Sequence, residues 1–576
     1  MRRPVAMLVL LALAVFAAAP ATAERRGASL RREVDLSLDG PVRIPEHGAH
    51  LSEDTMALSS VTNDRLSRSL MSGRISRAQF ALARVESTLE GEFDGHLSLL
   101  LTDLALRVGD LSGADRERAL AVLARPTDPG RDTSIDNVSY RDHAVEASCG
   151  QHFCVHWAET GRHAVDAVDA NANSTPDYVE AVQVEMENVW SVLIDDLGFR
   201  PPKSDATSEN TVPAADAGKL DVYLVESGSD GVYGYCTTDD PNLLDPSLGY
   251  EYFDGSAYCA LDNDFDPSQF LGAPAQESLQ VTAAHEFFHA VQLAYAAGHD
   301  TWMSEGTAAL MEDVVYDDVD DNYQYLLTSP MRRPGVPLDN STAPSHYGAW
   351  IFWRFLTELA PGESQPVFGP AVIRDVWDQA AFDGPGAPGL VSTFAATQAL
   401  ANNGISFPAA KSFFSFVNYV PEVFYEEGAD YLAEYGGKRP PAMGTFTLSG
   451  SRKATGKLVA TLDHLTAGYV VFKPGSGVRK LRVGVDLPAA ASRPSARILV
   501  MFSDGTIGTS TFDVNSSGVG ALTGIPFRKG TVRSAVLILD NASTKFKNCF
   551  ARNTPWTCSG APVHNGQQFQ LSATAG

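Results

Sequence analysis

The sequence of 576 residues is short of positive charge: 44 lysines and arginines face 70 aspartates and glutamates, for a formal net charge of -26 at pH 7. A surface this acidic repels phosphate groups, which argues against nucleic acid and against an anionic membrane as partners. Beyond its N-terminus the sequence also lacks any apolar run long enough to span a bilayer. It contains no internal repeat and no heptad array, which excludes a repeat protein and a coiled coil.

Cysteine is scarce as well, and no CxxC pair occurs among the six cysteines. This argues against a zinc site built from cysteine ligands. In an oxidising compartment an even number of cysteines indicates disulfides, and short-range pairing is the simplest expectation. The three expected pairs are Cys149 with Cys154, Cys236 with Cys259, and Cys549 with Cys558.

The N-terminus has the pattern of a secretory signal peptide. Arg2 and Arg3 precede the apolar run Val5–Ala19, and Ala21–Ala23 offers a small-residue cleavage site. We therefore expect residues 1–23 to be a signal peptide and the protein to be secreted to the extracellular space.

Changes in pattern divide the rest of the chain. Residues 24–135 carry helical periodicity and are interpreted either as a pro-region or as an N-terminal layer that the mature protein keeps, with Pro126–Gly130 as a boundary or exposed linker. Residues 136–437 mix strand-like with apolar helical segments. Residues 445–576 show an apolar period of two with polar turns, which is typical of a β-sandwich. The expected fold class is α+β.

The stretch Val281–Asp313 contains His285, Glu286 and His289 in the spacing HExxH. On a helix, positions i and i+4 lie one turn apart on one face, so both imidazoles can reach one metal ion. The flanking residues are uncharged and predict a helix buried nearly all round, where three such polar groups are costly unless paired or metal-bound. Glu305, at the start of the next predicted helix, is the third candidate ligand. Three protein ligands leave a fourth position for water, as in a catalytic zinc site.

His285–Gln292 together with Trp302–Asp313, which reads WMSEGTAALMED, resembles the gluzincin metallopeptidases. The similarity is greatest to a group of secreted bacterial metalloproteases and more distant to the aminopeptidase-N-like and thermolysin-like branches. It implies a zincin-like domain with a mixed sheet, an active-site helix and a helical C-terminal lobe. It also implies zinc bound by the two histidines and Glu305, Glu286 as general base, and hydrolysis of a protein or peptide substrate. The Gly-x-Met-Glu-Asn motif of the aminopeptidases is absent, so an endopeptidase is favoured.

Two further parts of an active site are expected. His346 and Tyr347, in the segment Ser345–Gly348, are candidate donors to the oxyanion, although either residue can instead cap or pack its helix. The predicted strand Ala257–Leu261 lies just upstream of the metal helix and is expected to accept extended substrate by strand addition.

An Asn- and Asp-rich segment has oxygen side chains at the offsets of an EF-hand calcium loop. The candidate calcium ligands are Asp169, Asn171, Asn173, Thr175, Asp177 and Glu180, with Thr175 contributing its backbone carbonyl. Ser174 stands where the turn glycine is usual, and Pro176 where a β-branched residue is usual. The alternative is a turn that only caps the helix that follows.

Three functions follow from these patterns. The leading one is a secreted zinc metallopeptidase. The second is a cation-binding extracellular adhesion or carbohydrate-binding protein whose zinc site is structural or inactive; such a closed site needs a fourth protein ligand, for which His299 and Asp300 are the nearby candidates. The third is zinc-dependent hydrolysis of a bond other than the peptide bond. The sequence predicts no oligomeric state.

Overall fold

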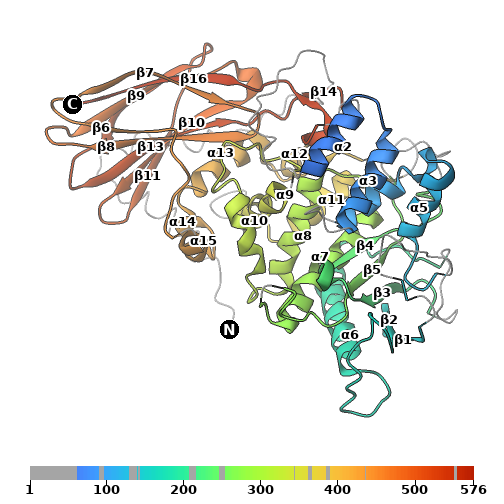
Figure 1. Cartoon of the computed structure of the whole chain (residues 1–576). Coiled ribbons are helices and arrows are strands. Elements are labelled where there is room, and N and C mark those ends of the chain that lie inside the picture. The colour runs from blue at the N-terminus through green and yellow to red at the C-terminus, as the bar shows by residue number, and fades with distance from the viewer. Residues whose placement is uncertain are drawn as a thin grey trace. The chain divides into compact units, whose positions relative to one another are not determined.

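The computed structural model describes residues 61–89, 97–128, 139–140, 143–206, 216–244, 253–270, 272–342, 344–360, 366–383, 389–434, 436–549 and 554–576. The protein combines α-helices with several β-sheets, in agreement with the expected α+β class (Figure 1). The predicted signal peptide, 1–23, lies outside the described residues.

The chain divides into two compact units. Leu51–Asn322 with Ile373–Ala395 belong to the first, here called the N-terminal unit, and Tyr323–Val372 with Ala396–Gly576 belong to the second, the C-terminal unit. The domain boundaries expected from the sequence, at 135 and 437, stay predictions.

The N-terminal unit is built on one five-stranded sheet with the strand order β1-β2-β3-β5-β4. Its strands are β1 (Val145–Cys149), β2 (Phe153–Ala158), β3 (Leu220–Val225), β4 (Gly234–Thr237) and β5 (Tyr258–Asp262). β2, β3 and β5 run parallel, whereas β1 and β4 pair antiparallel at the two edges. β5 therefore lies between β3 and β4, and the prediction that Ala257–Leu261 accepts an added strand is wrong. The free edge beside it belongs to β4.

Helices cover both faces of this sheet. On one face α6 (Asp177–Trp190) contacts β2, and α7 (Ala275–Tyr295) contacts β4 and β5. On the other face α3 (Arg77–Leu89), α4 (Leu97–Ala105) and α5 (Gly113–Leu123) share one hydrophobic core with Tyr223, Tyr235 and Tyr258 of the sheet. Both faces of β3 are buried, because side chains alternate between these two helical layers.

The remaining helices of this unit are α2 (Val61–Met71), α8 (Thr301–Val315) and most of α11 (Ala371–Ala380), and a π-helical turn, Ser191–Asp196, extends α6. Pro126, predicted to open an exposed linker, is buried instead. The preceding Arg125 is fully buried as well, so this segment runs through the interior and not over the surface.

α7 begins after Pro274 and ends at Tyr295, where Ala296 turns to an extended conformation. Gly298 then adopts a left-handed φ of 81°, and α8 begins after Asp300. Every residue of α7 from Val281 to Tyr295 is buried except His285, as the apolar sequence predicts. The predicted helix–loop–helix around the metal motif is thus confirmed.

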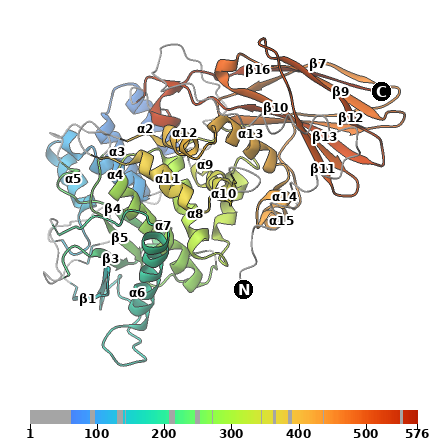
Figure 2. The same ribbon diagram turned by 180° about the vertical axis from the view of Figure 1, so that it is seen from behind.

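The C-terminal unit begins with helices and ends with two sheets (Figure 2). Its helices are α9 (Ser345–Gly348), α10 (Trp350–Glu358), most of α12 (Ser392–Asn402), α13 (Phe407–Val417), α14 (Pro421–Phe424) and α15 (Gly428–Glu434). α13 packs on β10 and β13. A buried ion pair of 2.7 Å joins Lys411 of α13 to Asp540 of β13.

The larger of these sheets has the order β11-β10-β13-β8-β6 and the smaller β12-β9-β16-β7. The strands are β6 (Gly444–Leu448), β7 (Ala454–Leu462), β8 (Thr466–Pro474), β9 (Lys480–Asp486), β10 (Pro494–Phe502), β11 (Ile507–Thr511), β12 (Val519–Pro526), β13 (Val532–Asn541) and β16 (Gln567–Ala575), and β14 (Phe546–Lys547) pairs with β15 (Ala561–Pro562). Phe472 and Leu537 from the larger sheet and Val483 and Phe569 from the smaller one belong to one hydrophobic core.

The three expected disulfides are present, between Cys149 and Cys154, Cys236 and Cys259, and Cys549 and Cys558. The first closes the β1–β2 hairpin, and the second joins β4 to β5. Among the helices that the structure describes, none combines the length and the apolar character that crossing a lipid bilayer requires.

Candidate metal centre

Two adjacent helices bring the three expected zinc ligands together. His285 and His289 lie one turn apart on α7, and Glu305 extends from the early part of α8. One ligand atom from each residue lies within 4.8 Å of the other two. Glu305 Oε2 is 3.1 Å from Nε2 of His285 and 3.7 Å from Nε2 of His289. Within the described part of the chain, this is the one group of three such side chains close enough to share an ion.

Each imidazole is also held by its other nitrogen. Nδ1 of His285 lies 2.6 Å from Oε1 of Glu312, and Nδ1 of His289 lies 2.9 Å from Oε1 of Gln292. The Gln292 amide in turn donates to the carbonyl of Ser304 at 2.9 Å. An Nδ1–H that donates to an oxygen leaves the lone pair of Nε2 for a metal. Both histidines therefore turn the ligating nitrogen toward Glu305.

Glu305 is fully buried, and its Oε1 has no hydrogen-bond partner among the residues that the structure describes. A buried carboxylate oxygen without a partner is costly unless a cation neutralises it. Two imidazoles and one carboxylate are ligands that zinc prefers, and three protein ligands leave a tetrahedral position open. The residues present therefore fit a zinc ion.

The electrostatics of the cluster also favour a cation. Burial alone would raise the pKa of Glu305, but His289 and His285 hold this pKa well below its usual range. Burial opposes a charge on His285, yet Glu305 and Glu312 raise the pKa of its imidazole well above the ordinary value. Burial raises the pKa of Glu312 to about 7. The cluster thus retains protons where a bound cation would take their place.

Glu286, the expected general base, lies next to His285 on α7 and is buried. Its Oε2 accepts a hydrogen bond of 2.8 Å from Oγ of Ser98 on α4, on the opposite helical layer. The same Ser98 oxygen accepts a bond of 3.0 Å from the backbone N–H of Cys236 on β4. The sequence did not single out Ser98, because nothing distinguishes it within a leucine-rich helical segment.

His346 and Tyr347, the expected oxyanion donors, belong to the C-terminal unit, where they form part of the short helix α9. His346 is fully buried, and its ring centroid lies 4.3 Å from that of Tyr347. Tyr347 stacks on Tyr325 at 4.7 Å. These contacts agree with the alternative that both residues pack their helix, and the catalytic role stays a prediction.

The two candidates for a fourth zinc ligand are engaged elsewhere. His299 is buried and lies with Nε2 3.2 Å from the carbonyl oxygen of Ala380, to which it donates. Asp300 accepts a short hydrogen bond from the hydroxyl of Ser392. Neither belongs to the metal-ligating group.

The candidate calcium loop is folded around its own side chains. Asp169 accepts from the backbone N–H of Asn173 at 3.1 Å and of Ser174 at 2.8 Å. The amide of Asn171 donates to Glu180 at 2.9 Å, and that of Asn173 donates to the same carboxylate. Ser174, in place of the usual glycine, takes a left-handed φ of 75°. Asp169, Asn171, Asn173 and Glu180 are thus linked by the loop, and Asp177 bonds Ala170; calcium binding there stays a prediction.

Comparisons with known proteins add little. No protein-family model matches this sequence, and no curated protein does. Among solved structures, one match is a family GH115 4-O-methyl-alpha-glucuronidase described as specific for decorated arabinogalactans. It shares 10% identity, and the match covers 66% of this chain and 54% of that chain at a TM-score of 0.12. This chain thus spans about half the length of that structure, and a likeness of this size supports no conclusion on fold or function.

Proposed function

We propose that this protein is a zinc-dependent metallopeptidase that hydrolyses peptide bonds in proteins. The observation that carries the proposal is the convergence of Nε2 of His285, Nε2 of His289 and the carboxylate of Glu305, with each Nδ1 held by another side chain. An open set of three ligands is the arrangement of catalytic zinc. The engagement of His299 and Asp300 in other bonds favours this open set over a closed structural site.

The roles of the residues follow from their positions. Zinc bound by such a set lowers the pKa of a coordinated water to about 7 and polarises a carbonyl group. Glu286, next to His285 in sequence, takes the proton of the attacking water and delivers it to the leaving amine. Glu312 and Gln292 orient the two imidazoles and fix which nitrogen is protonated.

β4 is the edge strand beside α7, and we propose that an extended peptide pairs with it. Pairing along an edge strand presents successive peptide groups without regard to side-chain identity, which suits an endopeptidase acting on unfolded protein. On this proposal the N-terminal unit is a zincin-like domain, the two sheets of the C-terminal unit form a β-sandwich, and the protein is secreted.

The test compares the wild type with Glu286→Gln. Zinc content is measured by mass spectrometry, and cleavage is measured on an unfolded protein and on a panel of non-peptide esters and glycosides. We expect unchanged zinc and a loss of peptide cleavage of roughly 10²–10⁴-fold, which is the usual contribution of a general base.

Glu277→Gln is the matched control, because Glu277 is an exposed acid in the first turn of the same helix. It should behave as the wild type does. Equal cleavage by wild type and Glu286→Gln would refute the proposal, and activity confined to the non-peptide substrates would replace it with the third function.

A further inference from the structure

The outer edge of β4 has its backbone groups turned away from the sheet. Cys236 faces Cys259 on β5 with a Cα–Cα distance of 4.0 Å. Antiparallel residues this close form a pair without mutual hydrogen bonds, so the N–H and C=O of Cys236 point away from β5. An added peptide strand would bond to these groups.

Ser98 of α4 already occupies this position. Its hydroxyl oxygen accepts the N–H of Cys236 at 3.0 Å, and its hydrogen is donated to Glu286 at 2.8 Å. The first bond uses the group that would hold a peptide, and the second uses the carboxylate that would accept a proton from water. One side chain, 3% exposed, therefore takes both places at once.

The helices that carry Ser98 are firmly attached to the sheet. We call α3, α4, α5 and the following Arg125 the N-terminal layer. Leu100, Leu101 and Leu104 of α4 lie in the core shared with the tyrosines of the sheet. The closed position of α4 is therefore stabilised by apolar burial as well as by the bonds of Ser98.

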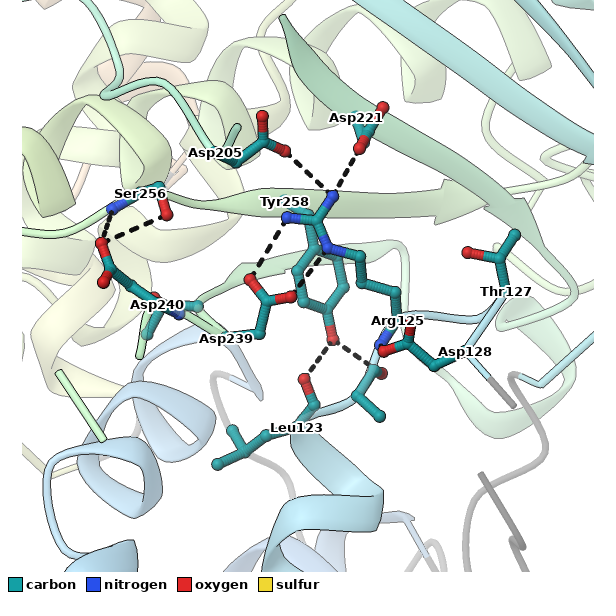
Figure 3. A network of polar contacts seen from close by, with 12 residues as sticks. Leu123, Arg125, Thr127, Asp128, Asp205, Asp221, Asp239, Asp240, Ser256 and Tyr258 are labelled. Carbon is teal, nitrogen blue, oxygen red and sulfur yellow. Dashed lines mark hydrogen bonds and ion pairs between the residues drawn. The ribbon is translucent and has the colours of Figure 1, made fainter. Parts of the chain in front are cut away.

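Arg125 anchors the end of this layer inside the unit (Figure 3). Its guanidinium is fully buried and pairs with Asp239 at 2.8 Å, with Asp205 at 2.9 Å and with Asp221. The ring of Tyr258 lies beneath it at 5.3 Å, and the Tyr258 hydroxyl donates to the carbonyls at the end of α5. Buried charges of this kind are costly to separate, which holds the layer in one place.

We propose that the N-terminal layer keeps the enzyme latent by closing the edge of β4, with Ser98 in the place of a substrate peptide group. Extended peptide binds only after α4 has moved off this edge. The inference rests on the proposed function for its biological meaning, but closure of the edge is testable separately. A protein with a small open fraction binds peptide with an apparent affinity reduced by that fraction.

The test measures binding of a fluorescent hexapeptide hydroxamate to the zinc-loaded full chain. Ser98→Ala removes both hydrogen bonds, and the open fraction should rise on the order of tenfold, which tightens the apparent affinity by the same factor. Hydrogen exchange at the Cys236 amide should accelerate in parallel, since its partner is gone.

Thr102→Val is the matched control. Thr102 lies one turn further along α4, and its hydroxyl donates to the Ser98 carbonyl within the helix at 2.9 Å. This bond exists whether or not α4 is docked, so the variant should bind the probe as the wild type does.

Equal affinity of wild type and Ser98→Ala, or no binding by either, overturns the inference. Tighter binding by Ser98→Ala without cleavage of any peptide refutes the peptidase function and leaves closure of the edge by α4 standing. Tighter binding together with faster cleavage supports both.

Discussion

Glu312 offers a sharp test of how the metal centre is built. Its carboxylate is 4% exposed and lies 2.6 Å from Nδ1 of His285. A carboxylate in this position fixes the imidazole and raises the basicity of the ligating nitrogen. Removing such a partner costs about 10–100-fold in metal affinity, which corresponds to about 1.4–2.7 kcal/mol.

Two substitutions divide this range. Glu312→Gln keeps an oxygen that can accept the Nδ1–H but removes the charge, so we expect the zinc dissociation constant to rise about tenfold. Glu312→Ala removes the acceptor as well and leaves the imidazole free to rotate, and the expected rise approaches 100-fold. The order of the two variants therefore separates the effect of charge from the effect of orientation.

The assay is a competition titration of zinc between the protein and a chromophoric chelator. Glu277→Gln, the exposed acid at the start of α7, again serves as control and should leave the dissociation constant unchanged. The reasoning is refuted if Glu312→Ala binds zinc within twofold of the wild type.

Three further predictions concern stability. Burial lowers the pKa of His299 to about 4 from 6.5, so the unfolded chain binds a proton that the folded chain refuses. Stability present above pH 6.5 is therefore lost as the pH falls toward 4, by about 3 kcal/mol, and urea unfolding of His299→Gln should lack this component. Arg125→Met leaves three carboxylates buried around an apolar side chain, and denaturant unfolding should show a loss of about 3–5 kcal/mol. Calcium at a hundredfold excess over its dissociation constant should stabilise the wild type by about 2.7 kcal/mol in calorimetry, and an equal gain in Asp169→Ala would contradict calcium binding by that loop.

The parts of the centre that the sequence predicts are those encoded by local geometry. The i, i+4 spacing of His285 and His289 has one meaning on a helix, and Glu305 follows after a single turn between helices. The disulfides were predictable for the same reason, because each joins neighbours in the chain. The apolar period likewise placed β7 to β10 and β13, whereas β11, β12 and β16, which are richer in Ser, Thr and Gly, went unnoticed.

What the sequence could not supply depends on contacts between distant segments. Ser98 and Glu286 are 188 positions apart, and their bond exists because two helical layers meet at the edge of one sheet. That edge is itself unpredictable from periodicity, since β5 enters the sheet between β3 and β4 and not after them. Arg125 precedes a Pro- and Gly-containing segment that resembles a linker, and only the carboxylates of Asp221 and Asp239 explain its burial.

The burial of α7 has a consequence for the rates of metal exchange. A helix enclosed on all sides has no low-energy local opening, so its amide hydrogens should exchange with solvent only through global unfolding. The same barrier applies to any movement of His289 or Glu305, which are almost fully buried, while the His285 side chain is 12% exposed. An ion must therefore enter and leave past His285, and chelators should strip the folded protein slowly even where equilibrium favours them.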